Sequence, residues 1–480
     1  MRKILMTCLV VLSVFLISGC STDKEEINIL ATTDLHGEIP YKLFSYVKNE
    51  FKKDKNLTLV DAGDFFDSGD VIPGEMGKYF DKRYENKNMN KYVEVPIAKE
   101  MKNVGYDAVV LGNHEFVSNN KFYLDNMISD FEKQGLKVLS ANTYKKDGES
   151  YTDPYIIKYI PTSSGIVKLG ILGLTIKEVG ESKDWVDDGT QDGKFVKSKS
   201  RELKDQPEYE GKLYMNDLVE DANKWIGKMK EDKADIIVAV VHSGEKPKKP
   251  KNPGNRIQDL ASEVDGIDAI VAGHTHKQIT QHNYKNKSGE NVIVTQPGKH
   301  GECISKINFQ LEKKNNEWNV VKKTSDITKF DLSDLRKEEE NNNAFFMKLD
   351  EVDDSVKNVN LSDITPFQWD EAFVFAPETP REIIYKEVGY KWRSITETEG
   401  TDMTQMLFMK DNKPVCYLYG KMDEIGLGVY FDKTKYKDNK VKIVPNENDK
   451  FSVKKEKFIE HIDFGDYNVE LNITHLEHIK

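Results

Sequence analysis

Residues of the types that can bind metal ions follow five apolar, β-branched segments of the chain, each at the point where the segment ends. The residues that close these segments are Asp34, His36, Asp64, Asn113, His114, His242, His274 and His276. Buried parallel strands have this length and composition, and open α/β sheets bind ligands beyond the carboxyl ends of their strands. We therefore expect the five ends to meet in one crevice that carries two Asp, one Asn and five His.

Such an inventory predicts a site for two divalent cations. Imidazole suits zinc and iron, whereas carboxylate and amide oxygens suit harder ions such as manganese. Two cations about 3.5–4 Å apart polarise a phosphoryl group, generate hydroxide near neutral pH and stabilise the leaving oxygen. The pair needs a bridging carboxylate, for which Asp64 beside Gly63 is the natural choice. A lone His at a strand end is usually a packing residue, but five of the ten His occur in these motifs.

The motifs DLHG, GD, GNHE, HSG and GHTH, in this order, resemble the calcineurin-like metallophosphoesterase superfamily. More narrowly, they resemble its extracytoplasmic 5′-nucleotidase and 2′,3′-cyclic-nucleotide 2′-phosphodiesterase branch, over residues 27 to about 330. The resemblance implies an α/β fold, a four-layer α/β/β/α sandwich. It also implies that His114 stabilises the transferring phosphoryl group and helps to protonate the leaving group. The implied ligands are Asp34, His36, Asp64 and His276 for one ion, and Asp64, Asn113, His242 and His274 for the other.

Two features depart from that branch. Its members usually carry Asp or Asn after the GNHEF motif, where this chain has Val117. Because the Asp of that pattern orients the catalytic His, we expect His114 to lack a carboxylate partner and to be a weaker acid–base group. The C-terminal Gly-rich loop and paired aromatics that hold a nucleobase in the family are not recognisable here. Base recognition and the substrate-binding residues therefore stay open.

The first twenty residues have the character of a targeting signal. Residues 1–3 supply positive charge, and residues 4–17 are apolar but too short to span a bilayer comfortably. The Ile-Ser-Gly-Cys sequence at residues 17–20 resembles a bacterial lipoprotein motif, in which cleavage precedes Cys20 and its thiol receives lipid. Diacylglycerol with an N-terminal acyl chain exceeds the two anchors that stable attachment needs. The alternative is an ordinary cleaved signal with an incidental Cys.

Length predicts two or three domains. We expect a signal peptide over residues 1–19, a tether over 20–26 and a catalytic domain over 27–335. A linker helix over 336–361 leads to a small C-terminal domain over 362–480, which is α+β or mostly β and of unknown role. Cys303 and Cys416 are expected to be buried free thiols, with a disulfide between them as the alternative.

The sequence thus predicts a metal-dependent phosphoric ester hydrolase that is lipid-anchored on the extracytoplasmic face of the membrane. In its expected mechanism a metal-bridging hydroxide attacks phosphorus in line. Nucleotides or cyclic nucleotides are the expected substrates on resemblance alone. The alternatives are a phosphoesterase for surface polymers or lipid head groups, and a surface binding lipoprotein that has lost turnover. Loss of the signal takes the net charge from −11 to −13, so a nucleic-acid polymer is not an expected partner.

Overall fold

The computed structural model describes residues 24–37, 39–67, 75–85, 90–186, 194–246, 254–389, 395–398, 400–462 and 467–479. Cys20 and the expected signal peptide lie outside the described residues. Within the described part of the chain, no helix is both long enough and apolar enough to cross a membrane.

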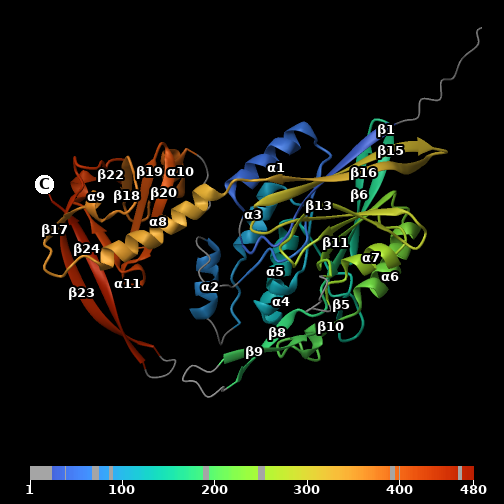
Figure 1. Ribbon diagram of the computed structural model, residues 1–480, viewed down its shortest axis with the longest axis horizontal. Coiled ribbons are helices and arrows are strands. Elements are labelled where there is room, and N and C mark those ends of the chain that lie inside the picture. Colours follow the sequence, from blue (N-terminus) through green and yellow to red (C-terminus); the bar gives the residue numbers. More distant parts are fainter. Residues whose placement is uncertain are drawn as a thin grey trace, which may run out of the picture.

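Two six-stranded sheets packed face to face form the larger part of the molecule (Figure 1). In the first sheet β1 to β4 are parallel, and β15 and β16 continue the sheet in antiparallel fashion beyond β1. The strand order is β16 (Glu317–Lys329), β15 (Cys303–Lys314), β1 (Lys24–Thr32), β2 (Thr58–Asp61), β3 (Ala108–Val110) and β4 (Lys137–Leu139). Its outer helices are α1 (Tyr41–Lys53), α3 (Pro96–Val104) and α5 (Lys121–Lys133).

The second sheet has four parallel strands between two antiparallel edge strands. Its order is β13 (Gln278–Lys285), β14 (Asn291–Pro297), β12 (Ala269–Ala272), β11 (Ile236–His242), β7 (Gly165–Thr175) and β6 (Tyr155–Thr162). The helices on its outer face are α6 (Leu218–Glu231) and α7 (Ile257–Glu263). The Asp217 side chain caps α6 by accepting from the main-chain nitrogen of Val219 at 2.9 Å.

Three apolar cores hold these layers together. One lies between the two sheets, and the other two lie under the helices on either side. The fold is therefore the expected four-layer α/β/β/α sandwich. The five apolar segments that the sequence singles out are β1, β2, β3, β11 and β12, and their buried residues feed these cores. The last three residues of the expected tether, from Lys24 on, already belong to β1.

Short elements surround the edge at which the parallel strands end. They are α2 (Glu75–Glu85), α4 (Asn113–Val117), β5 (Thr143–Lys145), β8 (Gly180–Val186), β9 (Lys194–Arg201), the 3-10 turn η1 (Leu203–Asp205) and β10 (Leu213–Met215). The buried Tyr209 fastens the segment after β9 to the body, because its hydroxyl donates to the main-chain oxygens of Phe116 at 2.9 Å and Asn119 at 2.6 Å.

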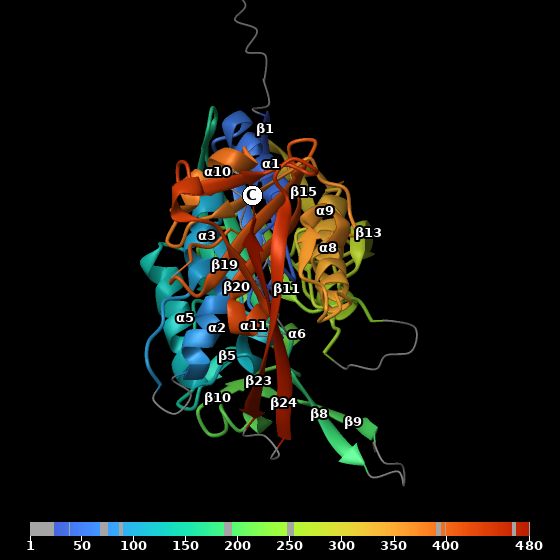
Figure 2. The same ribbon diagram turned by 90° about the vertical axis from the view of Figure 1, so that its left-hand side faces the viewer.

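The C-terminal region is mostly β, as expected. One sheet contains β17 (Asn358–Asn360), β23 (Lys450–Ile462), β24 (Tyr467–His478) and β21 (Leu427–Tyr430). The other contains β20 (Lys413–Lys421), β19 (Met403–Lys410), β18 (Glu371–Phe375) and β22 (Lys440–Ile443). The helices are α8 (Ser333–Asp350), α9 (Leu361–Ile364), α10 (Arg381–Val388) and α11 (Met422–Ile425), with a 3-10 turn η2 (Lys433–Lys435). Figure 2 shows β23 and β24 as a long hairpin that extends from this module.

Helix α8 packs into the C-terminal module as part of its core. Phe345 and Leu349 are buried in one cluster with Phe408 of β19 and Cys416 of β20. The helix begins before the expected linker does, and the C-terminal module covers its apolar face. Cys303 and Cys416 are both buried and free, as expected.

Helix α2 lies between the two parts of the molecule (Figure 1). The ammonium group of Lys78 donates to the main-chain oxygen of Glu397 at 2.9 Å and lies 5.7 Å from the ring centre of Tyr419. Arg83 of the same helix donates to the Asn119 side chain at 2.9 Å and to the main-chain oxygen of Ser118 at 3.2 Å. The helix therefore connects the C-terminal module to the segment that follows α4.

Removal of the Phe345 side chain should destabilise the C-terminal module. Phe345 is fully buried, so Phe345→Ala should lower the free energy of unfolding of this module by about 3–5 kcal/mol. Denaturant unfolding followed by fluorescence measures the change. Met347→Ala is the matched control, because Met347 lies on the same helix and is 70% exposed. Equal stability of the two variants would contradict the assignment of α8 to the module's core.

Candidate metal centre

All eight side chains that the sequence singles out lie at one edge of the two packed sheets. Asp34 and His36 follow β1, Asp64 follows β2, Asn113 and His114 begin α4 after β3, His242 ends β11, and His274 and His276 follow β12. Ligand atoms lie within 4.8 Å of one another in each of three groups: Asp34, His36 and His276; Asp64, His242 and His274; and His36, Asp67 and His114. The sandwich therefore brings together residues from both sheets that are up to 242 positions apart in the sequence.

Sharp backbone turns aim these side chains back at the edge. Five of them have left-handed backbone: φ is 52° at Asp34, 47° at His36, 55° at Asp64, 68° at His274 and 56° at His276. Such a conformation costs roughly 1–3 kcal/mol per non-glycine residue and persists only where the surrounding structure fixes it. The concentration of this strain at one edge indicates a functional site.

The first cluster contains Asp34, His36 and His276. The two imidazole Nε2 atoms of His36 and His276 lie 3.2 Å apart, and His276 Nε2 lies 3.4 Å from Asp34 Oδ1. Asp34 is fully buried, whereas the His276 side chain is 38% exposed. The cluster therefore has a closed floor and an open mouth.

The second cluster contains Asp64, Asn113, His242 and His274. Asn113 Oδ1 lies 3.0 Å from His242 Nε2 and 2.9 Å from His274 Nδ1, and Asp64 Oδ2 lies 3.1 Å from His242 Nε2. The other ring nitrogen of His242 lies 2.8 Å from the main-chain oxygen of Ala62. A carbonyl at that position holds the proton on Nδ1 and leaves Nε2 for a ligand.

The donors in both clusters fit divalent cations. Imidazole nitrogen, carboxylate oxygen and amide oxygen together suit manganese, zinc or iron. Burial lowers the pKa of His242, but the Asp64 carboxylate outweighs burial and raises this pKa to about 10. A cation that bound Nε2 of His242 would displace the proton from Nε2 and would lie beside the buried carboxylate of Asp64. The residues present therefore fit the metal ions that the sequence predicts, without distinguishing among them.

His114 has a carboxylate partner, so the expectation drawn from Val117 is wrong. His114 Nδ1 lies 3.0 Å from Asp67 Oδ1, and the other oxygen of Asp67 lies 3.2 Å from His36 Nδ1. Burial lowers the pKa of His114, but Asp67, with help from Asp64, raises it to about 9. Val117 is 49% exposed. The loop after β2 runs beside α4, and it supplies the carboxylate from a position that the sequence motif does not indicate.

Two further residues at the site were not singled out from the sequence. The ring centre of His300 lies 5.2 Å from that of His36, and the main-chain nitrogen of His300 donates to the main-chain oxygen of Asp34 at 2.8 Å. Burial, with the nearby His36, lowers the pKa of His300 to about 4. The only sequence signal was a His in a Gly-rich turn after the β14 segment, which is too common to identify a site.

The second of these residues is Glu115, which fastens the two loops together. Its carboxylate accepts from the main-chain nitrogens of Asp64 at 3.0 Å, Phe66 at 2.9 Å and Gly112 at 2.5 Å. A Cβ atom at Gly112 would lie 2.3 Å from Asp64 Oδ1, so only glycine fits there. The GNHE motif therefore supplies a ligand, a catalytic candidate and the hydrogen bonds that hold Asp64 in place.

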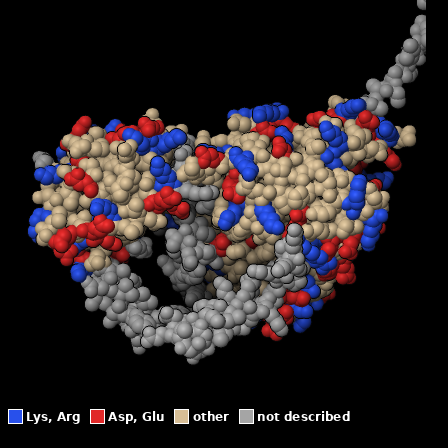
Figure 3. Space-filling view, viewed as in Figure 1, with Lys and Arg blue, Asp and Glu red and all other residues tan. Residues whose placement is uncertain are grey.

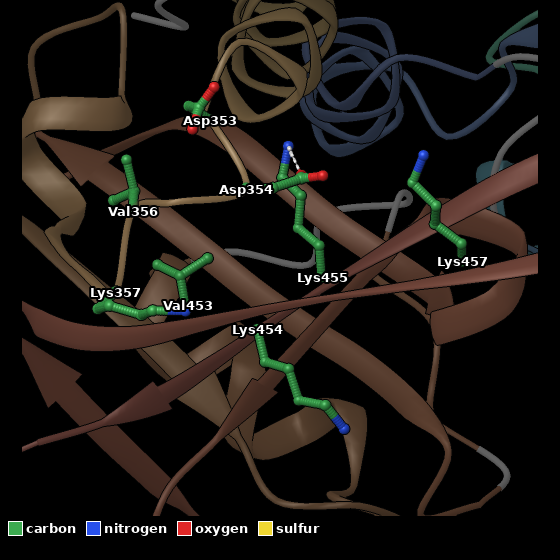
Figure 4. A pocket seen from close by; sticks show the side chains of 8 residues that line it. All are labelled: Asp353, Asp354, Val356, Lys357, Val453, Lys454, Lys455 and Lys457. Carbon is green, nitrogen blue, oxygen red and sulfur yellow. Dashed lines mark ion pairs between the residues drawn. The ribbon is translucent and has the colours of Figure 1, made fainter.

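A separate hollow lies in the C-terminal module (Figure 4). It has a volume of about 260 Å³ and is lined by Asp353, Asp354, Val356, Lys357, Val453, Lys454, Lys455 and Lys457. Lys455 pairs with Asp354 at 4.0 Å, and Figure 4 shows Lys454 pointing away from the other lysines. The hollow has no metal-binding cluster among its residues. It is not part of the candidate centre.

Comparison with known proteins gives a family and several relatives. A model of the calcineurin-like phosphoesterase family matches residues 27–278. The chain is similar to the trifunctional nucleotide phosphoesterase protein YfkN of Bacillus subtilis, with 28% identity over 325 residues. It is also similar to a 2′,3′-cyclic-nucleotide 2′-phosphodiesterase/3′-nucleotidase of Yersinia enterocolitica, with 24% identity over 322 residues.

The matches to these relatives are partial. Each covers 62% of this chain, but only 20% of the Bacillus protein and 44% of the Yersinia protein. Among solved structures, the calcineurin-like phosphoesterase YfkN from Bacillus subtilis matches with 26% sequence identity and a TM-score of 0.49, over 64% of this chain and 91% of that one. The region matched by the family model, residues 27–278, contains both clusters.

Removal of His276 should reduce metal binding. His276→Ala deletes one donor of the first cluster, so we expect the purified protein to lose up to one ion per chain by elemental analysis. Its melting temperature should also fall, because a bound ion stabilises only the folded state. His282→Ala is the control: His282 is exposed and pairs with Glu245, 2.8 Å away, outside both clusters. An unchanged metal content in His276→Ala would contradict the assignment of His276 as a ligand.

Proposed function

Because the chain belongs to the calcineurin-like phosphoesterase family, we propose that it hydrolyses phosphoric esters with two divalent cations. The single observation that carries this proposal is that two clusters of metal-binding side chains lie at the same edge of the sandwich. Asp64 would serve both cations: it lies 3.1 Å from His242 of the second cluster, and, although burial raises its pKa, it is close enough to His36 of the first cluster for the charge of His36 to lower that pKa.

The remaining ligands divide between the clusters. We assign Asp34, His36 and His276, with Asp64, to one cation, and Asn113, His242 and His274, with Asp64, to the other. When bound, the cations polarise the phosphoryl group and lower the pKa of water. The full burial of Asp34 and His242 keeps water away from the floor of the site, which strengthens the attraction between the ligands and the cations.

His114 is the proposed acid–base residue, and Asp67 positions it. The His114 side chain is 32% exposed, so it can reach a substrate at the mouth of the site. The contact between His114 Nδ1 and the Asp67 carboxylate, at 3.0 Å, holds the imidazole in place and favours its protonated form. A protonated imidazole stabilises developing negative charge on the phosphoryl group and donates a proton to the leaving oxygen.

Nucleotides or 2′,3′-cyclic nucleotides are the proposed substrates. The support is that the Bacillus and Yersinia relatives are named for nucleotide phosphoester chemistry. The phosphate must be attracted locally, because Lys and Arg are interspersed with Asp and Glu on the face in Figure 3 and the net charge is negative. The complete clusters and the paired His114 favour turnover over a binding role alone.

We also propose that the protein is attached to the extracytoplasmic face of the membrane through lipid on Cys20. The support is the sequence of residues 1–20, in which an apolar stretch ends in Ile-Ser-Gly-Cys.

A panel of phosphoesters tests the proposed activity. We expect hydrolysis of nucleoside monophosphates or 2′,3′-cyclic nucleotides in the presence of Mn²⁺ or Zn²⁺, and its loss with a chelator. Asp64→Ala should reduce hydrolysis to background, because the bridging carboxylate is removed. A folded protein that contains metal and hydrolyses no ester in the panel would contradict the proposed function.

Asp67→Asn tests the positioning role of Asp67. We expect turnover to fall about 10–100-fold, as for other residues that orient a site from behind. The loss should be largest for esters with poor leaving groups, because those depend most on a proton from His114. Metal content should fall less than in His276→Ala, because Asp67 contacts His36 at Nδ1 and not at the Nε2 atom that faces His276. Val117→Ala, at an exposed position, should behave as wild type. If the loss were equal for good and poor leaving groups, Asp67 would not act through His114.

A further inference from the structure

One end of the catalytic sandwich, opposite the metal centre, contains the first residues of β1. Here the Glu25 carboxylate accepts from the main-chain nitrogen of Ser164, 2.9 Å away in the turn between β6 and β7. The main-chain oxygen of Ser164 accepts in turn from Lys313 Nζ, at the end of β15, at 2.8 Å. We call this end the base of the sandwich, comprising residues 24–25, 159–168 and 313–321. Figure 1 shows β1, β6, β15 and β16 meeting there.

The base exposes large apolar side chains to solvent. The exposed fraction is 61% for Tyr159, 58% for Ile166 and 50% for Val321. Val321 is the extra residue of a bulge, and its neighbour Val320 pairs with Leu311 of β15, which pairs with Glu25. Eight large hydrophobic side chains are exposed in the described part of the chain, and three of them lie at this end. Such a concentration indicates a surface that contacts something apolar.

Covalent geometry limits what that partner is. Lys24 lies four positions after Cys20, and four extended residues span at most ~14 Å. If Cys20 carries lipid, the first residue of β1 lies within that distance of the bilayer. The hydrogen bonds from Glu25 to the β6–β7 turn place Ile166 near the same end.

We propose that the base of the sandwich is a lipid-contact surface, in which Tyr159, Ile166 and Val321 rest in the interface of the bilayer. This inference rests on the proposed lipid anchor at Cys20. Of the lysines at the base, Lys24 and Lys314 pair with Glu312, at 3.3 and 3.5 Å. Lys168 and Lys313 donate to main-chain oxygens. Apolar side chains that enter the headgroup region add to the attachment that the lipid provides.

The orientation decides which substrates reach the site. β7 runs 11 residues from Gly165 at the base to Thr175, which pairs with the metal-ligand candidate His242. A strand of this length spans about 35 Å. With its base on the bilayer, the protein holds the metal centre that far from the membrane and opens it to the aqueous side. The substrate class is therefore a water-soluble phosphoester, and lipid head groups of the same membrane are out of reach.

Fluorescence quenching tests the orientation in the lipidated full-length protein. Removal of the signal takes away Cys8, lipidation consumes the Cys20 thiol, and Cys303 and Cys416 are buried, so Ile166→Cys supplies a single exposed thiol for a bimane label. Met347→Cys is the matched control, since Met347 is 70% exposed on α8 of the C-terminal module. Both proteins are reconstituted in phosphatidylcholine vesicles that contain a doxyl-labelled lipid, with and without phosphatidylglycerol.

We expect the label at position 166 to shift to the blue and lose intensity in vesicles of both compositions, and the label at 347 to do neither. Val321→Cys should behave like Ile166→Cys. Equal quenching at 166 and 347, or none at 166 in vesicle-bound protein, would overturn the proposal. If Cys20 also took up the label and vesicles did not retain the protein, Cys20 would carry no lipid, and the proposal would be overturned because its anchor is absent. The protein would still hydrolyse esters in the phosphoester panel if it had no lipid anchor. Failure of this proposal can therefore be told apart from failure of the proposed function.

Discussion

The buried carboxylate of Asp64 is the constraint on which the rest of the site depends. It is 2% exposed and meets His242 from the second sheet and the backbone of His114 from the first. A charge at this depth is stable only if opposite charge and hydrogen bonds surround it. Glu115 holds the Asp64 backbone, and Gly112 leaves room for its side chain. The two sheets must therefore pack face to face with their strand ends level, because only then do all these groups reach one carboxylate.

Asp67 shows that a chemical role need not keep its place in a motif. A general acid needs an oriented imidazole, and any carboxylate that reaches Nδ1 provides this. In this chain the loop after β2 supplies that carboxylate. The position after GNHEF therefore does not have to carry one, and it holds the exposed Val117. The same Asp67 also contacts His36, so it links the proposed acid–base residue His114 to a candidate ligand of the first cluster. A substitution at one of these three residues should therefore alter the position or charge of the other two.

Helix α2 and the C-terminal module lie beside this centre. Lys78 and Arg83 of α2 contact the C-terminal module on one side and the segment after α4 on the other. The C-terminal module has its own core, into which α8 packs, so it has the properties of an independent folding unit attached beside the site. The base of the sandwich lies at the far end of the strands. Parallel strands separate the two ends of the domain by their own length, so attachment at one end leaves the other free for substrate.

The sequence by itself determined the strands and the ligand candidates. Apolar β-branched segments that end in Asp, Asn or His specify both a buried strand and the residues at its end, and this information is local. The resemblance carried by these motifs implied the four-layer sandwich. Separate features of the sequence predicted an α+β or mostly β C-terminal region and two buried free cysteines. Only the tertiary structure decided that Asp67 pairs with His114, that His300 lies beside His36 and that α8 belongs to the module after it. These outcomes depend on how loops distant in sequence meet in space. The preferences of neighbouring residues do not encode such contacts, because loop paths are fixed by packing and hydrogen bonds across the whole fold.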